Sequence, residues 1–190
     1  MPDLTPVYRP MTVADIDATG YIRKAALEGL AVSQNRPINP WQPRRYPHFE
    51  HLLKTDPDGA WVASIGGTVI GFSMGFVRGQ TWFLAQLFVQ PEVHAHGIGR
   101  ELLRLAIDAG RARGATVLSV VASTGHVSQS VYMRAGMFAR GIGYGMSGPV
   151  DALRALPEPT ANRKTVVDCG GWQDRIADLD TEVWSAPRRE

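Results

Sequence analysis

Apolar side chains recur at helical spacing in two long stretches of the chain. Thr12 stands three residues before Asp15, the spacing of a capped helix start, and apolar residues then follow at intervals of three and four. This pattern predicts a helix over residues 13–30. A second helix is predicted over residues 99–113, because most of its bulky apolar residues share one face. Gly114 follows it as a C-terminal cap.

Between these two helices the pattern changes to short runs that are typical of strands. They cover residues 60–65, 68–76 and 81–89, and Pro91 ends the third run. Gly66-Gly67 joins the first two runs at a point where a hairpin turn requires positive φ. We therefore expect an antiparallel meander of three strands.

Shorter elements complete the pattern. Short helices are predicted over residues 48–54 and 128–135, a buried strand over residues 116–121 and another strand over residues 137–146. Several prolines exclude a long regular element from residues 31–47, which we interpret as a loop.

The end of the chain is interrupted by prolines and has a weaker pattern. We expect a domain over residues 1–150 and a C-terminal extension over residues 151–190. The extension holds a strand candidate, residues 164–169, and a helix candidate, residues 173–183. It either completes the sheet or mediates oligomerisation, for example as a homodimer.

Composition and charge narrow the class of protein. The 190 residues are 44% hydrophobic, enough for one good core, and a net charge of +2 with dispersed basic residues does not favour nucleic acid as a partner. The lone Cys169 cannot form an internal disulfide, which suits a reducing cytoplasm. No run of apolar residues is long enough to span a membrane. The sequence thus indicates a soluble, cytoplasmic protein without a membrane partner.

Two glycines stand at the start of the second long helix, directly after a predicted strand. A helix N-terminus carries unpaired N–H groups and partial positive charge, and Gly97 and Gly99 let a phosphate approach the backbone. The alternative is a tight loop between strand and helix. A dinucleotide fingerprint and a P-loop both fit less well, because a third glycine and a Gly-Lys-Ser/Thr are missing.

The segment His94-Ala95-His96-Gly97-Ile98-Gly99-Arg100 resembles the acyl-CoA-binding signature of the GCN5-related N-acetyltransferases, the GNAT family. His94 stands where that family usually has Gln or Arg. Further on, Tyr132 to Met137 is similar to the family's Tyr-x-x-x-Gly-Phe segment, with Met137 in place of Phe. The resemblance covers roughly residues 8–146.

The resemblance implies an α/β fold with a mixed, mostly antiparallel sheet, helices on both faces and a splayed strand pair that admits acyl-CoA. It implies acetyl-CoA, or another short acyl-CoA, as the cofactor. The residues implied to bind it are Phe88, Val89, His94, Ala95, His96, Gly97, Ile98, Gly99, Arg100 and Ser128. The oxyanion is expected at a backbone amide near Phe88 and Val89, where a bulge would splay the strands.

Tyr132 is the candidate general acid, since a phenol keeps its proton at neutral pH and a departing thiolate needs one. The alternative is that Tyr132 only packs its helix against the sheet. No carboxylate occurs in residues 81–90, so the general base is a water chain or another group such as His126. Gln86 cannot act as a base. We expect no metal, because His48 with His51 and His94 with His96 are pairs that lack a third ligand.

These features favour an N-acetyltransferase that moves acetyl from acetyl-CoA to a primary amine of a small molecule or a peptide. A non-catalytic acyl-CoA-binding or regulatory module is the alternative. The segment from Asn39 to Tyr46 is expected to wall the acceptor pocket. Arg44 and Arg45 would there favour an acceptor that bears a carboxylate; otherwise the segment is a solvated basic loop.

Overall fold

The computed structural model describes residues 5–38, 46–93, 96–123, 125–141, 143, 151 and 178. The chain divides into two units after Phe138, and the first comprises Met1–Phe138. The strand expected over residues 164–169 lies outside the described residues, as does the helix expected over residues 173–183 apart from Asp178. The expected domains, 1–150 and 151–190, stay a prediction.

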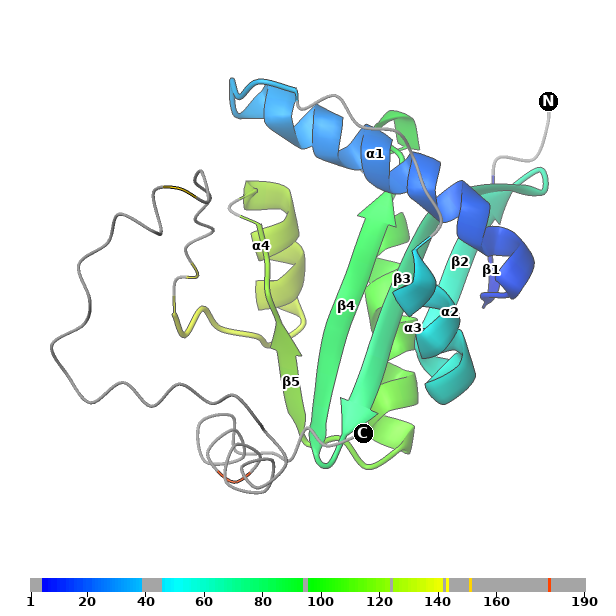
Figure 1. The fold of residues 1–190 in the computed structure, drawn as a ribbon, viewed down its shortest axis with the longest axis vertical. Coiled ribbons are helices and arrows are strands. Elements are labelled where there is room, and N and C mark those ends of the chain that lie inside the picture. The colour runs from blue at the N-terminus through cyan, green and yellow to red at the C-terminus, as the bar shows by residue number, and fades with distance from the viewer. Residues whose placement is uncertain are drawn as a thin grey trace, which may run out of the picture. The chain divides into compact units, whose positions relative to one another are not determined.

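A five-stranded sheet forms the centre of the first unit (Figure 1). The strands lie side by side in chain order, β1 (Val7–Pro10), β2 (Ala60–Ile65), β3 (Thr68–Arg78), β4 (Thr81–Val89) and β5 (Val117–Val120). Each neighbouring pair from β1 to β4 is antiparallel, whereas β4 and β5 are parallel. The mixed, mostly antiparallel sheet expected from the sequence is confirmed.

The meander β2–β3–β4 forms where the sequence predicts it. Gly66 and Gly67 turn the first hairpin with φ of 56° and 81°, which side chains with a Cβ adopt rarely. β1 was not predicted, because it is only four residues long and ends at a proline. Such a strand is too short to show a period in the sequence.

Two expectations about the last strands were wrong. β5 is not buried, since Val117 is 45% exposed and the other three residues are half-buried. Its β-branched run fits a strand but does not require one that is covered on both faces. Residues 137–141 and 143, the described part of the strand expected over 137–146, have no strand conformation. Met137 packs into the core beside Trp82 and Ile107, which accounts for an apolar residue at this position.

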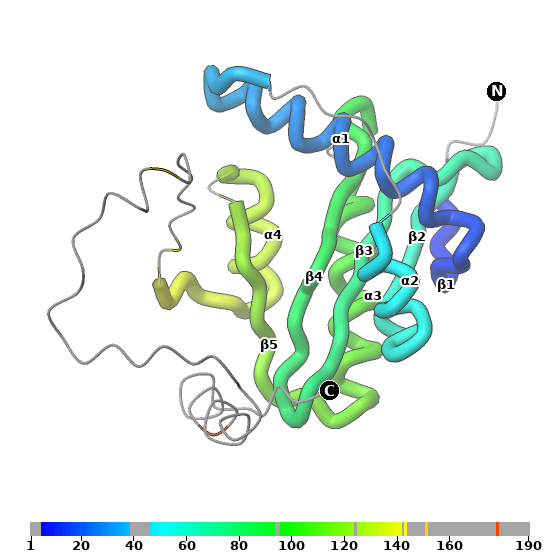
Figure 2. Tube along the Cα trace, in the orientation of Figure 1, coloured from blue at the N-terminus to red at the C-terminus, as the bar shows by residue number. Residues whose placement is uncertain are grey.

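Helices cover both faces of the sheet (Figure 2). The first face is covered by α1 (Ile16–Ser33), which follows the 3₁₀ turn Val13–Asp15, and by α2 (Pro47–Thr55). The other face is covered by α3 (Ile98–Ala112) and α4 (His126–Arg134). All four helices were expected, with ends that differ by one to three residues. None of the helices in the described part of the chain is long and apolar enough to cross a membrane.

Each face has its own core. On the first face, Ile22 of α1 and Phe49 of α2 pack against Phe72 and Met74 of β3. On the other face, Leu103 and Ile107 of α3 pack with Trp82 of β4, and α4 adds Val131 and Tyr132 at the margin. The sheet therefore lies between two helical layers, and the central strands β3 and β4 both contact α1 on one face and α3 on the other.

Candidate active site

The parallel strands β4 and β5 separate halfway along β4. Their pairing begins at Thr81 with Val117 and ends at Leu84 with Val120, although β4 continues to Val89. Figures 1 and 2 show the chain that follows β5 diverging from β4 beyond this point. The backbone of the second half of β4 therefore faces an open cleft instead of a neighbouring strand, as the fold class expected from the sequence requires.

A β-bulge marks the point of separation. Met74 pairs with Gln86 and Gly75 pairs with Leu84, so Ala85 is the extra residue on β4. The expected position at Phe88 and Val89 was wrong, because these residues pair regularly with β3. A bulge bends its strand and increases the local twist, which turns the end of β4 away from β5.

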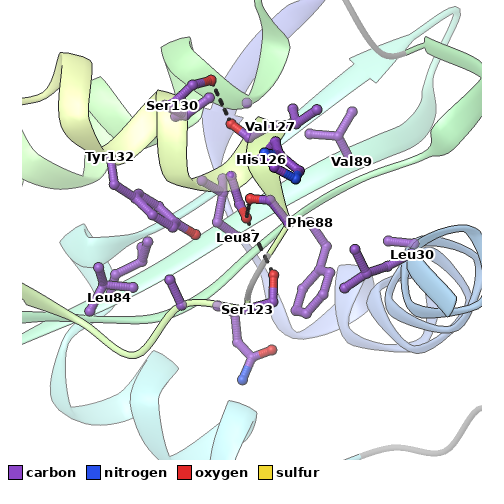
Figure 3. Close-up of a pocket in the computed structure, with 18 of the residues that line it drawn as sticks. Leu30, Leu84, Leu87, Phe88, Val89, Ser123, His126, Val127, Ser130 and Tyr132 are labelled. Atoms are coloured by element: carbon purple, nitrogen blue, oxygen red, sulfur yellow. Dashed lines mark hydrogen bonds between the residues drawn. The ribbon is translucent and has the colours of Figure 1, made fainter. Parts of the chain in front are cut away.

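The cleft between the diverging strands has a volume of about 1220 Å³. Its walls come from the C-terminal half of α1, the second half of β4, the start of α3, the segment after β5 and α4. Figure 3 shows Phe88 and Leu30 lining one side and Tyr132 pointing in from α4. A space of this size is suitable for a ligand as large as a nucleotide thioester.

The start of α3 opens into this cleft. Gly97 is the N-cap with φ of 76°, and the first intrahelical hydrogen bond runs from the Glu101 amide to the Gly97 carbonyl, at 3.0 Å. The amides of Ile98, Gly99 and Arg100 thus have no acceptor within the helix. All three residues and Gly97 line the cleft. The geometry is that of an anion site at a helix N-terminus.

The two glycines of this turn have different physical roles. Gly97 adopts a left-handed conformation that disfavours any side chain. A Cβ on Gly99 would lie 3.6 Å from the nearest side-chain atom, Cγ2 of Val89, which is an ordinary contact. Gly99 is therefore not required by packing, and its missing side chain leaves the approach to the amides open.

Some of the other residues predicted to bind the cofactor line the cleft, and others lie outside the described residues. His94 and Ala95 lie outside the described residues. The His96 side chain is exposed, with Nδ1 3.3 Å from the Val93 carbonyl oxygen, and Arg100 is exposed at the mouth of the cleft. Phe88 and Val89 line the cleft from β4.

Tyr132 projects from α4 toward the cleft, while its ring packs at the margin of the core (Figure 3). Tyr132 therefore packs its helix against the sheet, which was one of the two expectations, and it also lines the cleft; its role as general acid stays a prediction. Burial raises the pKa of the Tyr132 phenol. The hydroxyl has no hydrogen-bond partner among the residues that the structure describes. This group can therefore donate its proton to a ligand.

Small polar side chains surround the start of α4. The Ser128 hydroxyl donates to the Gly125 carbonyl at 2.9 Å, and it lies 3.3 Å from the Ser123 hydroxyl. His126 is the first residue of α4 and lines the cleft with an exposed side chain. Ser128 and His126 are thus in the same cleft as Tyr132.

The charges that line the cleft all have one sign among the described residues. They are Arg23, Arg100 and Arg134, with His126 as the one imidazole, and no aspartate or glutamate is present. The sequence analysis missed Arg23, because a charged residue within a helical pattern is normally assigned to the solvent face. Arg44 and Arg45 lie outside the described residues. No three His, Cys, Asp or Glu side chains gather into a metal site in the described part of the chain.

The chain is a mixed α/β protein in which a helix N-terminus opens into a cleft beside a splayed strand pair. Residues 23–137, more than half of the chain, match the model of the Acetyltransferase (GNAT) family. The chain belongs to this family, as the resemblance of its two motifs indicated.

The chain is also similar to individual proteins. It is 35% identical over 68 residues, 32% of the chain, to an uncharacterized N-acetyltransferase of Archaeoglobus fulgidus. Among solved structures, it is similar to an acetyltransferase of Pyrococcus horikoshii, with a TM-score of 0.58, 21% identity and 69% of this chain covered. It is also similar to the PaiA N-acetyltransferase of Thermoplasma acidophilum in complex with coenzyme A, with a TM-score of 0.58, 16% identity and 69% of this chain and 88% of that chain covered. The chain spans 46% of the Archaeoglobus relative and 42% of the Pyrococcus protein.

Proposed function

We propose that the protein is an N-acetyltransferase that moves acetyl from acetyl-CoA to a primary amine of a small molecule or a peptide. One observation carries this proposal. The open amides at the start of α3 and the Tyr132 hydroxyl belong to the same cleft, and the β4–β5 separation lies between α3 and α4. The similar PaiA structure, which contains coenzyme A, supports it.

Different residues of the cleft would bind different parts of acetyl-CoA. The amides of Ile98, Gly99 and Arg100 would receive the pyrophosphate, with His94, Ala95, His96 and Gly97 forming the loop. The backbone of β4 beyond Leu84, where the pairing with β5 ends, would hold the pantetheine arm by strand-like hydrogen bonds. Ser128 would add a hydroxyl contact. Bound acetyl-CoA would supply an activated thioester.

Other groups of the chain would assist the transfer of the acetyl group to the amine. The amine nitrogen bonds to the thioester carbonyl carbon, the bond from that carbon to sulfur breaks, and the sulfur takes a proton from Tyr132. A backbone amide of β4 stabilises the oxyanion. The proton of the amine leaves through water or to His126, because no carboxylate lines the described part of the cleft, and Tyr132 regains a proton from solvent.

Calorimetry with acetyl-CoA and a thiol-release assay with an amine panel test this function. We expect micromolar-range binding to be abolished in Gly99→Glu, which would place a carboxylate against the phosphates. Gly99→Ala should keep the fold, because a Cβ fits there at 3.6 Å from Val89, and it should weaken binding less than Gly99→Glu does. Absence of heat with any coenzyme A derivative in the wild-type protein would overturn the proposal.

A non-catalytic acyl-CoA-binding module is the second candidate, and one observation favours it. β4 and the described walls of the cleft have no carboxylate to act as a base. Binding of acetyl-CoA without release of thiol to any amine of a broad panel would support this alternative. The homodimer expected from the sequence is tested by the mass of the full chain in solution.

A further inference from the structure

The second half of α1 presents apolar side chains to the cleft instead of to the core. In the first half of the helix, Ile16 and Ile22 are fully buried in the core of the first face. Leu27 and Leu30 line the cleft, are only half-buried and belong to none of the described core clusters. These two leucines therefore keep apolar surface that a ligand in the cleft can cover.

Phe88 continues this apolar surface onto β4. It pairs with Phe72, which belongs to the core of the face covered by α1 and α2. Directly opposed residues of an antiparallel pair point to the same side of a sheet, so the half-buried ring of Phe88 faces the α1 side of the cleft. Figure 3 shows Phe88 and Leu30 on the side of the cleft away from Tyr132. We call Leu27, Leu30 and Phe88 the apolar wall.

Leu30 extends from α1 as far as the residue that precedes α4. Its Cδ1 atom would lie 3.1 Å from a Cβ placed on Gly125, the N-cap of α4. The side chain is thus held between the two helices that border the cleft. A molecule that enters the cleft between α1 and α4 therefore contacts Leu30.

The position of Tyr132 leaves the apolar wall to the acceptor. On the proposed function, Tyr132 protonates the departing sulfur, so the sulfur lies on the α4 side of the cleft. The attacking amine must reach the carbonyl carbon from another direction. The α1 side, with the apolar wall, is the part of the described cleft that remains for it.

The cleft offers no counter-ion for an additional positive charge on the acceptor. No aspartate or glutamate lines its described part. Most of its walls come from stretches of sequence that contain neither residue, namely 29–49, 59–91, 93–100 and 109–150. A second ammonium group would lose water there without gaining a partner. The same surroundings favour the uncharged form of the reacting amine, which is the form that attacks.

We propose that the acceptor is an aliphatic or aromatic monoamine whose apolar body lies against Leu27, Leu30 and Phe88. The inference rests on the proposed function, because Tyr132 assigns the two sides of the cleft. It makes Leu30 a residue that determines specificity for the acceptor. Diamines and polyamines are poor acceptors on this account.

Matched amines test the inference through thiol release from acetyl-CoA. Ethylamine and n-pentylamine differ only in apolar length, whereas 1,5-diaminopentane and 5-aminopentanoate add a cation or an anion to a five-carbon chain. We expect kcat/KM for n-pentylamine to exceed that for ethylamine by about tenfold or more, since each methylene that enters an apolar pocket contributes. It should exceed that for 1,5-diaminopentane by a similar factor.

Variants assign these preferences to the apolar wall. Leu30→Ala should reduce the preference for n-pentylamine over ethylamine. Leu30→Asp supplies a counter-ion, so it should raise kcat/KM for 1,5-diaminopentane relative to n-pentylamine by about tenfold or more. Each comparison is a ratio between two amines in one variant, so a change in coenzyme affinity cancels.

Val32→Asp is the matched control for Leu30→Asp. Val32 belongs to the same helix, is 66% exposed and does not line the described cleft. The control adds the same charge and should leave both ratios unchanged. Should Leu30→Asp not fold, Leu30→Ala and the wild-type ratios still decide the matter.

A longer acyl chain is the other molecule that could cover the apolar wall, and the same variants exclude or establish it. The ratio of kcat/KM for hexanoyl-CoA to that for acetyl-CoA is measured with n-pentylamine as the acceptor. If Leu30→Ala changed this ratio and left the ratio of the amines unchanged, the wall would receive the acyl chain and the inference would be wrong.

The remaining outcomes distinguish the inference from the proposed function. Calorimetry of the same amines with the coenzyme A complex gives a readout that needs no turnover. Tighter binding of n-pentylamine than of 1,5-diaminopentane, without thiol release, would keep the inference and overturn the enzyme. Thiol release with equal or better use of 1,5-diaminopentane or 5-aminopentanoate would keep the enzyme and overturn the inference. Equal effects of Val32→Asp and Leu30→Asp would also overturn it.

Discussion

Tyr132 is the single residue on which the proposed chemistry depends most. Its phenol is held in the cleft by the packing of its own ring, and burial raises its pKa, so the proton stays on the oxygen well above neutral pH. Tyr132→Phe keeps the ring and removes the proton donor. We expect kcat for thiol release to fall about 10²-fold, as for other general acids, while the Kd for acetyl-CoA changes little in calorimetry.

The pH profile and a control complete this test. An acid is active while protonated, so the wild-type kcat should decline only as pH rises through the raised pKa, and that decline should be absent in Tyr132→Phe. Tyr21→Phe is the control, because Tyr21 of α1 is 67% exposed. A variant with wild-type kcat and an unchanged profile would assign Tyr132 to packing alone.

Local sequence signals were sufficient for some residues of the candidate site and insufficient for others. Gly97, Gly99 and Tyr132 were found because glycines before a helix and the spacing of two motifs are visible in the sequence. Arg23 was not predicted as a residue of the cleft, because its position there depends on contacts between elements that lie far apart in the sequence. The bulge at Ala85 changes which side chains of β4 point to each face of the sheet. Alanine is small enough to lie on either face, so the sequence does not reveal the bulge.

At the scale of elements, α3 is fixed to β4 by the contact of Trp82 with two glycines. A Cβ on Gly110 of α3 would lie 2.3 Å from Cδ1 of Trp82, and one on Gly75 of β3 would lie 2.5 Å from its Nε1. Trp82 is fully buried, so it cannot move aside easily. The close approach of helix and sheet therefore requires glycine at both positions.

Gly110→Ala should consequently destabilise the protein, although the same change inside a helix normally stabilises it by up to about 1 kcal/mol. Overpacking of a core costs about 1–3 kcal/mol, which exceeds that gain. We expect the free energy of unfolding in urea to fall by about 1 kcal/mol or more. Gly29→Ala in α1 is the control, since its Cβ would lie 3.4 Å from Pro91 and should give unchanged or increased stability. Stabilisation by both substitutions would contradict this account of the contact.

The sequence pattern predicted the long, well-buried elements and was less informative for the short strands. α3 has a strong helical pattern because one side of it packs into a core. The strands of the β2–β3–β4 meander are covered on both faces, and they were recognised as apolar runs that are bounded by turn residues. The patterns of β1 and β5 are weak because these strands are short and partly exposed. Apolar residues after Gly136 suggested a strand, although Met137 is buried by packing and not by sheet pairing. Apolar character alone cannot separate these two causes.

Two buried carboxylates connect distant parts of the first unit. Asp15 accepts from both Nη atoms of Arg9 at 2.7 Å, and from the Thr12 amide and hydroxyl at 2.8 Å, which ties β1 to the start of α1. Asp56, whose side chain is fully buried, accepts from Arg78 at the end of β3 and from Arg113 after α3. The loop after α2 is thereby fixed to the end of the sheet opposite the cleft (Figure 1).

Both carboxylates favour the charged form in the folded state. The hydrogen bonds from Arg9 are the largest cause for Asp15 and lower its pKa to about 2, against the opposing effect of burial. For Asp56, burial is the largest single effect and would raise the pKa. The hydrogen bonds from Arg78, Thr55, Arg113 and the Val77 amide together outweigh it, so the pKa is lowered.

The stability of the fold should therefore decrease at acidic pH. A carboxyl whose pKa is lower in the folded state stabilises the fold above its unfolded pKa, near 4, and this contribution is lost as pH falls through the folded value. Urea unfolding should show a free energy that declines between about pH 4 and pH 2.

Asp15→Asn should lose about 2 kcal/mol at pH 7 and show a shallower decline, because the lowered pKa of Asp15 corresponds to about that amount. Asp108→Asn is the control at pH 7, since its pair with Arg104 is half exposed and such pairs contribute about 0–1 kcal/mol. An Asp15→Asn protein with the stability and acid dependence of the wild type would show that Arg9 and Thr12 position Asp15 without stabilising the fold.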